Sequence, residues 1–250
     1  MRLIAMAKGQ EAALLTPAGQ DFYPVAFRLE ERFGTCVGVH LTVARSIEPA
    51  ALLRSLHRDE QALCRSMKGA RLVEFVGGRH ASRLARAGMP GAGSPTLAGS
   101  SGAPQVGGGA KISISHTQTL AVALASAEQG FGIGVDIEAV TTDTIGEELL
   151  AERIMSPAEL DGSLSNGPSI ETVQRLSIKE AVYKAAFALT GTHLPLRQIS
   201  VERTERGGAQ FRVLVPVATM RVEAMSIRVE EHFLSLAQAS LPPRAIQDPI

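Results

Sequence analysis

The stretch GIGVDIEAV occupies residues 132–140 and places two carboxylates, Asp136 and Glu138, inside an otherwise apolar run. A run of this length predicts a strand, in which residues two apart point to the same face. Two carboxylates on one face repel each other, and both lose hydration when they are buried. The pair therefore indicates either a solvated strand end or a face that holds a cation.

Strands and helices are predicted on both sides of this stretch. KISISH (111–116) and TLAVALAS (119–126) are expected to pair as a hairpin before it. Helices are expected over Ile145–Ile154 and from about Ser169 to Leu189, with a loop over 161–169. The remaining predicted strands are QISVERT, AQFRVLVPV, MSIRVEEHF and LSLAQA.

The first half of the chain reads as a strand and a helical region followed by a flexible one. VGVHLTVA (37–44) predicts a strand, and helix is expected from about Pro49, most clearly over 59–87. The Gly77–Gly78 pair predicts a kink. Residues 88–110 are rich in Gly, Ser, Pro and Ala, which predicts a long mobile loop.

The second stretch that carries chemistry is LSIKEAVYKAAF, residues 176–187. Glu180 and Lys184 are four apart and share a helix face, where a solvated ion pair is the common outcome. Alternatively, Glu180 joins Asp136 and Glu138 as three oxygen ligands for Mg²⁺, and Lys184 holds a phosphate.

Other cationic residues have both a structural and a functional interpretation. His116 ends the KISISH strand and is either a surface residue or part of a site. Arg71, Arg79, Arg83 and Arg86 lie on the first long helix, as a solvated basic face or as a fork for phosphates. GIG at 132–134 lacks the third glycine of a dinucleotide fingerprint and is discarded.

Composition limits the class of protein. The chain has 250 residues, 45% of them hydrophobic, and zero formal net charge, which argues against a dedicated nucleic-acid binder. Cys36 and Cys64 form no metal motif, so a reducing cytoplasm is expected. No apolar run of 18 residues exists, so no membrane span is expected, and LIAMA with Lys8 is too short for a signal peptide.

Three motifs resemble the 4′-phosphopantetheinyl transferases, specifically their large monomeric type, which includes enterobactin synthetase component D and the surfactin-synthetase activator. The motifs are ISISHT (112–117), GIGVDIE (132–138) and LSIKEAVYKA (176–185). RLVEFVGGR (71–79) is similar to the arginine-bearing helix of the enterobactin branch. The resemblance covers roughly residues 65–190 and is highly specific in the G-[IV]-D-x-E and KE-x3-K pair.

The resemblance implies a fold and a reaction. The fold is α+β, with two pseudo-symmetric lobes (1–130 and 131–250), each a small antiparallel sheet packed with a long helix, and a ligand cleft between them. The reaction moves the phosphopantetheine arm of coenzyme A onto a carrier-protein serine and releases 3′,5′-ADP. It implies a cytoplasmic monomer that serves nonribosomal peptide, polyketide or siderophore synthesis, with no nucleic-acid or membrane partner.

The resemblance also implies roles for individual residues. Mg²⁺, with Mn²⁺ as an alternative, is held by Asp136, Glu138 and Glu180, and Glu180 is also the general base. Lys184 contacts the pyrophosphate, with Lys179 beside it. Coenzyme A phosphates are bound by His116 with Ser115 and, at the nucleotide end, by Arg71 and Arg79. Glu159, in MSPAE, matches a family glutamate.

The chain departs from this family at one place and leaves two rival functions open. The enterobactin branch has a tryptophan-proline element and a basic residue before its SxxH stretch, where this chain has SSGAPQVGGGAK and no tryptophan. Either Lys111 replaces this basic residue or the contacts with adenine are weaker.

Two rival functions stay open. One is another Mg²⁺-dependent phosphoryl transferase or a coenzyme A-cleaving hydrolase, and the other is a non-catalytic coenzyme A-binding protein.

Overall fold

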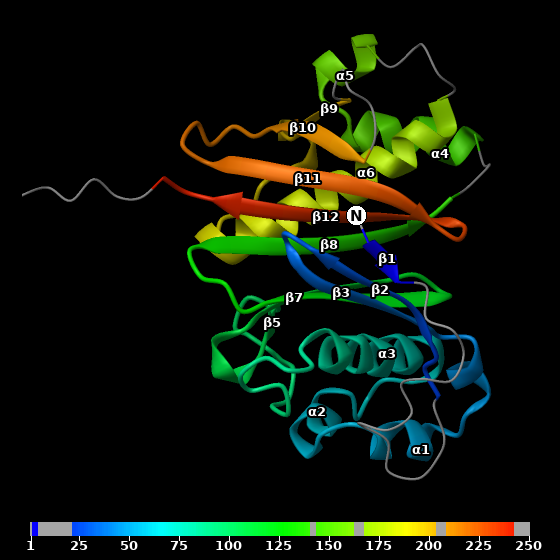
Figure 1. The fold of residues 1–250 in the computed structure, drawn as a ribbon. Coiled ribbons are helices and arrows are strands. Elements are labelled where there is room, and N and C mark those ends of the chain that lie inside the picture. Colours follow the sequence, from blue (N-terminus) through cyan, green and yellow to red (C-terminus); the bar gives the residue numbers. More distant parts are fainter. Residues whose placement is uncertain (1, 5–21, 141–143, 163–167, 204–208, 243–250) are drawn as a thin grey trace, which may run out of the picture.

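Two five-stranded antiparallel sheets make up the centre of the molecule (Figure 1). The computed structural model describes residues 2–4, 22–140, 144–162, 168–203 and 209–242. The first sheet has the order β1 (Arg2–Ile4), β2 (Val25–Glu31), β3 (Gly34–His40), β7 (Leu120–Ser126), β6 (Lys111–His116). The second has the order β8 (Phe131–Ala139), β12 (His232–Ser240), β11 (Arg221–Val229), β10 (Gln210–Leu214), β9 (Ser200–Arg203).

Each sheet is packed against one long helix. The helices are α1 (Pro49–Arg54), α2 (Arg58–Leu63), α3 (Gly69–Ala85), α4 (Thr144–Ile154), α5 (Pro157–Gly162) and α6 (Pro168–Thr190). Short elements are β4 (Leu97–Ala98), β5 (Pro104–Gln105) and the 3₁₀ turns η1 (Val43–Ser46), η2 (Gly107–Gly109) and η3 (Leu196–Gln198). α3 covers the first sheet and α6 the second (Figure 1). The predicted fold class, α+β with two sheet-and-helix lobes, is confirmed; the division of the chain at residue 130 and the ligand cleft stay predictions.

The free faces of the two sheets pack against each other. Their shared core contains Phe27, Cys36 and Leu124 from the first sheet and Val135 and Leu236 from the second. The resulting order of layers is α3, first sheet, second sheet, α6. No helix in the described ranges combines the length and apolar character that crossing a membrane would require.

Strand β7 lies at the centre of the first sheet's packing, and every residue in it is buried. Its larger residues, Leu120, Val122 and Leu124, face the second sheet, whereas the alternating alanines belong to the core beneath α3.

Helix α3 lies close to the first sheet. A Cβ at Gly77 would collide with the side chain of Leu41, which directly follows β3. The kink predicted at Gly77–Gly78 is therefore wrong: the glycines bring an unbroken helix onto the sheet.

Several predicted boundaries change. Helix is interrupted within 59–87, since α2 ends at Leu63 and α3 begins at Gly69. MSIRVEEHF is not one strand, because the hairpin between β11 and β12 turns at Glu230, whose φ is 50°. The predicted loop at 161–169 is partly helical, with α5 reaching Gly162 and α6 starting at Pro168; residues 163–167 lie outside the described part.

The segment 88–110 is folded, contrary to the predicted structureless loop. It contains the β4–β5 hairpin and wraps around Arg86, whose side chain is fully buried. The Arg86 guanidinium donates hydrogen bonds to the carbonyl oxygens of Gly91 (3.0 Å) and Ser94 (2.9 Å), and to Thr96 Oγ1 (3.3 Å). Glu60 Oε1 accepts a bond from Thr96 N at 2.8 Å. The hydrogen bonds of Arg86 and Glu60 thus hold residues 88–110 in place, although this segment has few large apolar side chains to form a core.

Candidate active site

The two carboxylates of the opening stretch lie on the face of β8 that α6 covers. Gly132 and Gly134 precede them on the same face, and a Cβ at either glycine would collide with the carbonyl oxygen of Ala185 or Ala181. α6 therefore rests directly on the backbone of β8. This close packing brings the helix residues Glu180 and Lys184 next to the strand carboxylates.

Asp136 is held at one oxygen by two partners. Its Oδ1 accepts hydrogen bonds from Lys184 Nζ (2.7 Å) and Ser115 Oγ (2.8 Å), and the residue is only 3% exposed. Lys184 Nζ also donates to Ser115 Oγ and to the Val135 carbonyl, each at 3.1 Å. Lys184 is thus turned toward the strand, and within the described residues it forms no ion pair with Glu180.

Ser115 connects the two sheets at this point, because β6 and β8 are the edge strands that meet there. Its hydroxyl hydrogen is donated to Asp136, so it is not free to donate to a coenzyme A phosphate in this arrangement. In this arrangement Ser115 positions Asp136, and its expected contact with a coenzyme A phosphate stays a prediction.

Glu138 and Glu180 share the electrostatic environment of Asp136. Burial raises the pKa of Glu138 to about 7, and the negative charges of Asp136 and Glu180 add to this while Lys184 opposes it. Burial also raises the pKa of Glu180, which Lys184 and His193 partly offset while Asp136 adds to the rise. The two glutamates therefore hold a proton more readily than exposed carboxylates do.

The fit of a divalent cation rests on one orphaned atom. Asp136 Oδ2 is buried and has no hydrogen-bond partner among the described residues. Within the same residues, no three His, Cys, Asp or Glu side chains already form a closed ligand group. An oxygen with a free lone pair beside two carboxylates of raised pKa is nevertheless the donor chemistry that Mg²⁺ prefers. The donor chemistry suits a divalent cation, and Asp136, Glu138 and Glu180 are the residues that would hold it.

His116 lies against α3 rather than standing alone at the surface. Its Nδ1 is 3.8 Å from Glu74 Oε2, and its side chain is 46% exposed. Burial lowers the pKa of His116; Glu74 opposes this, whereas the nearby charges of Lys184 and Arg71 add to it. A second charged group, made of Arg71, Glu74 and His116, thus lies near Lys184. We call Asp136, Glu138 and Glu180 the carboxylate cluster; Lys184 contacts it at Asp136. Sequence reasoning missed Glu74, although it lies one helical turn after Arg71.

The other arginines, which lie on α3 or directly after it, separate into two kinds. Arg79 stacks on the Phe75 ring, with 3.7 Å between the guanidinium carbon and the ring centroid. Its buried Nε lacks a hydrogen-bond partner in the described part of the chain. By contrast, Arg83 donates to the Ser55 carbonyl at 2.9 Å, and Arg86 anchors residues 88–110. The phosphate-fork interpretation therefore does not extend to Arg83 and Arg86.

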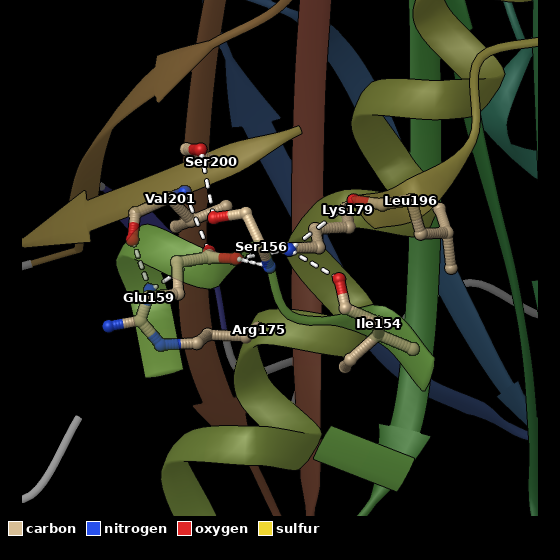
Figure 2. A network of polar contacts seen from close by, with 8 residues as sticks. All are labelled: Ile154, Ser156, Glu159, Arg175, Lys179, Leu196, Ser200 and Val201. Carbon is tan, nitrogen blue, oxygen red and sulfur yellow. Dashed lines mark hydrogen bonds and ion pairs between the residues drawn. The ribbon is translucent and has the colours of Figure 1, made fainter. Parts of the chain in front are cut away.

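Lys179 lies in the protein interior. Its side chain is fully buried, and its Nζ donates to Glu159 Oε2 (2.5 Å), the Ile154 carbonyl (2.6 Å) and the Leu196 carbonyl (3.3 Å) (Figure 2). All three ammonium hydrogens have protein acceptors, so Lys179 offers no free donor to the pyrophosphate here, and its expected place beside it stays a prediction.

Glu159 is the centre of the same network (Figure 2). Its oxygens accept bonds from Ser156 N (2.7 Å), Val201 N (2.9 Å) and Arg175 Nη1 (3.1 Å) as well as from Lys179. Burial raises the pKa of Glu159, but the hydrogen bonds from Lys179, Ser156 and Val201 outweigh it and bring the pKa below its ordinary range. The network ties α5, α6 and β9 together and has a structural role.

Three further polar side chains near the site make their contacts within the protein itself. Lys111 Nζ donates to the Phe131 carbonyl and lies 4.6 Å from the centroid of that ring, so it is not a free base for adenine or phosphate. Ser113 Oγ accepts from Val135 N (3.0 Å), and Ser177 Oγ donates to the Phe233 carbonyl (3.3 Å). Neither serine contacts a base that would make it a nucleophile.

Comparison with known proteins gives the class. The model of the 4′-phosphopantetheinyl transferase superfamily matches residues 132–237, and that of the 4′-phosphopantetheinyl transferase N-terminal domain matches residues 59–126. The two matches together span more than half of the chain. The chain therefore belongs to the 4′-phosphopantetheinyl transferase superfamily and is a transferase. No curated protein matches the sequence significantly.

Solved structures similar to this chain are holo-acyl-carrier-protein synthases. The one from Neisseria meningitidis is 23% identical, with a TM-score of 0.36, over 44% of this chain and 97% of that chain. The one from Plasmodium yoelii is 18% identical, with the same TM-score and coverage. The one from Helicobacter pylori, in complex with coenzyme A, is 17% identical, with a TM-score of 0.33, over 44% of this chain and 99% of that chain.

Proposed function

We propose that the protein transfers the 4′-phosphopantetheine arm of coenzyme A to a serine of an acyl, peptidyl or aryl carrier protein. The reaction depends on Mg²⁺ and releases 3′,5′-ADP. The observation that carries this proposal is the buried Asp136 carboxylate, which is paired with Lys184 at Oδ1 and left open at Oδ2 beside two carboxylates of raised pKa.

Asp136, Glu138, Glu180 and Lys184 divide the chemistry among them, and Glu180 has two tasks. Asp136, Glu138 and Glu180 hold the cation, which when bound offsets negative charge on the pyrophosphate. Lys184 adds a second positive charge at the same place, where it supports in-line displacement by electrostatic stabilisation. Glu180 takes the proton of the incoming serine as the general base.

The bond changes are those of a direct transfer. The serine oxygen of the carrier protein attacks the β-phosphorus of coenzyme A, while the bond between that phosphorus and the oxygen of 3′,5′-ADP breaks. The attacking hydroxyl belongs to the partner, since Ser113, Ser115 and Ser177 of this chain are bonded to Asp136 or to backbone groups and contact no base that would activate them. No covalent enzyme intermediate is expected.

The nucleotide end of coenzyme A is assigned to α3, which carries Arg71 and Arg79, and to His116 at the end of β6. Arg71 and His116 lie together, and the buried Nε of Arg79 has no hydrogen-bond partner among the described residues. We propose that these three residues bind the 3′-phosphate. The same proposal includes a cytoplasmic monomer with no nucleic-acid or membrane partner, which serves carrier proteins of nonribosomal peptide, polyketide or siderophore synthesis.

Intact-mass analysis tests the reaction. Carrier proteins are incubated with this protein, Mg²⁺ and coenzyme A labelled in its pantetheine arm. The expected result is a phosphopantetheine-sized mass gain on the carrier, none on a carrier whose acceptor serine is changed to alanine, and none on the enzyme. Glu180→Gln serves as the inactive control and exposed Glu152→Gln as the active one.

Other outcomes of this assay identify the rival functions. Release of 3′,5′-ADP without a modified carrier indicates a coenzyme A-cleaving hydrolase. Binding of coenzyme A with neither product indicates a non-catalytic protein. A labelled enzyme contradicts direct transfer and requires a two-step mechanism.

A further inference from the structure

A second orphaned polar atom lies directly beside Asp136. Ser235 of β12 stands opposite Asp136 of β8 in the antiparallel register, and its side chain is fully buried. Like Asp136 Oδ2, Ser235 Oγ has no hydrogen-bond partner within the described residues. A buried polar group without a partner is costly, so two such groups in adjacent positions call for a common explanation.

The register places both side chains on the face of the sheet that α6 covers. Directly opposite residues of an antiparallel pair share a face and have Cβ atoms about 4.5–5.5 Å apart. At that spacing a serine hydroxyl and a carboxylate oxygen meet through a change of rotamer or through one bridging water. The neighbouring pair on this face, Gly134 opposite Ala237, has no polar side chain.

The remaining serines nearby are already bonded. Ser226 of β11 stands opposite Ser235 on its other side, and its hydroxyl lies 3.3 Å from Gln174 Nε2. Ser177 of α6 donates to the Phe233 carbonyl. Asp136 Oδ1 accepts hydrogen bonds from Ser115 and Lys184, whereas Oδ2 has no partner within the described residues. Unlike Ser226 and Ser177, Ser235 has a hydroxyl that is not already bonded there, so it can serve Oδ2.

We propose that Ser235 is a positioning residue: its hydroxyl donates to Asp136 Oδ2, directly or through a water, and fixes that oxygen toward the divalent cation. A carboxylate oxygen has two lone pairs, so one accepts from Ser235 while the other faces the cation. The inference rests on the proposed function, because it concerns the cation that the carboxylate cluster is proposed to hold.

The first test is cation binding without turnover. Free Mn²⁺ is measured by electron paramagnetic resonance while it is titrated into protein and coenzyme A, with no carrier protein present. Ser235→Ala is expected to weaken Mn²⁺ binding about 10-fold or more, as loss of a partner to a ligating carboxylate typically does. Ser235→Thr, which keeps the hydroxyl, is expected to retain most of the affinity.

The matched control is Ser226→Ala, which removes a buried hydroxyl from the same face one strand further from Asp136. It is expected to leave Mn²⁺ affinity unchanged. Because Ser235→Ala removes the hydroxyl that is proposed to donate to the buried Asp136 Oδ2, its thermal midpoint without metal should not exceed that of the wild type. Its turnover should recover at high Mg²⁺.

Three results would overturn the inference. They are Mn²⁺ affinity of Ser235→Ala equal to that of the wild type, an equal loss in Ser226→Ala, and turnover of Ser235→Ala that high Mg²⁺ does not restore. If the wild type modifies a carrier protein while Ser235→Ala binds Mn²⁺ normally, only the positioning role fails. If the wild type with coenzyme A binds no Mn²⁺, the proposed cation fails with it.

Discussion

At the scale of single residues, Asp136 shows how this chain keeps a carboxylate in its interior. Burying an ionised group is costly unless it is paired and hydrogen-bonded. Oδ1 meets both conditions through Lys184 and Ser115, whereas Oδ2 meets neither within the described part of the protein. The residue is thus only half satisfied among the described residues, which supports the proposed cation beside Oδ2.

Lys184 should therefore stabilise the metal-free protein mainly through Asp136. Lys184→Met is expected to lower the free energy of unfolding by about 2 kcal/mol, less than for a fully buried pair because the Lys184 side chain is 26% exposed. The double variant Asp136→Asn/Lys184→Met should lose less than Lys184→Met alone. Urea unfolding in EDTA measures both.

A surface ion pair provides the control for this cycle. Arg212 and Glu202 are 3.6 Å apart with both side chains more than half exposed, so Arg212→Met should cost under about 1 kcal/mol. Equal losses in Lys184→Met and in the double variant would mean that the ion pair with Asp136 is not what Lys184 contributes.

Arg71 and Arg79 of α3, together with His116, should set the preference for coenzyme A over dephospho-coenzyme A. A charge-assisted hydrogen bond contributes about 1.5–3 kcal/mol, so Arg71→Ala, Arg79→Ala or His116→Ala should each reduce the preference roughly tenfold or more. Competitive binding of the two ligands measures it. Arg58→Ala, which alters a side chain that is 89% exposed on α2, is the control. An unchanged preference in all three variants would remove these residues from the site.

At the scale of elements, the contact between β8 and α6 determines where the chemistry lies. Gly132 and Gly134 let the helix backbone rest on the strand backbone, and Asp136 and Glu138 continue the same face beyond the point of closest approach. The glycines of GIGVDIE are therefore spacers for packing, and the carboxylates take their position from them.

Gly134→Ala should consequently disturb both stability and the site. The added methyl group collides with the Ala181 carbonyl, so α6 must move away from β8. Overpacking of this kind costs about 1–3 kcal/mol, and sometimes more. Gly93→Ala, where a Cβ meets nothing within 4 Å, should be nearly neutral. Thermal unfolding measures both, and a Gly134→Ala variant as stable as wild type would contradict the close packing.

The elements around the site were the most predictable from sequence. Alternation and helical spacing identify β6, β7, β8, α4 and α6, because each pattern is local. The turn at Glu230 was missed because a glutamate with positive φ carries no glycine signal. The fold of 88–110 was missed because it depends on Arg86, which lies outside that segment in sequence. The burial of Lys179 depends in the same way on the distant Glu159.

At the scale of the whole molecule, the two sheets share one core, so neither can lose its structure alone without exposing the apolar face of the other. This arrangement predicts a single cooperative unfolding transition. The chain offers a test, since it contains no tryptophan and only two tyrosines, Tyr23 in the core beneath α3 and Tyr183 on α6.

Variants with one tyrosine separate the two halves. Tyr183→Phe leaves Tyr23 as the fluorescent probe of the first half, and Tyr23→Phe leaves Tyr183 as the probe of the second. In each variant, tyrosine fluorescence and far-ultraviolet circular dichroism should give the same urea midpoint. Two separate midpoints would show that the shared core does not couple the halves.

His80 should make the stability of the whole molecule depend on pH. Burial, with a contribution from the charge of Arg83, lowers the pKa of His80 to about 4. An unfolded histidine takes up its proton near pH 6.5, so between about 6.5 and 4 the unfolded state binds more protons and stability falls as the pH falls. A tenfold difference in proton affinity is worth about 1.4 kcal/mol, so the loss approaches about 3 kcal/mol.

Replacement of His80 isolates this contribution. In His80→Gln, the decline in unfolding free energy between pH 6.5 and 4 should be smaller by that amount, whereas exposed His193→Gln should keep the wild-type decline. Urea unfolding at several pH values gives the comparison, and identical slopes in the wild type and His80→Gln would contradict it.

The meeting of β6 and β8 also bears on how the molecule behaves at high concentration. Each is the last strand of its sheet on that side, and such strands usually invite other chains to add to them. Here Ser113 caps the Val135 amide with its hydroxyl, and Ser115 and Lys184 close the neighbouring positions. The side chains that prepare the site for its ligand thus also shield two strand edges from self-association, so a substitution here puts solubility at risk together with activity.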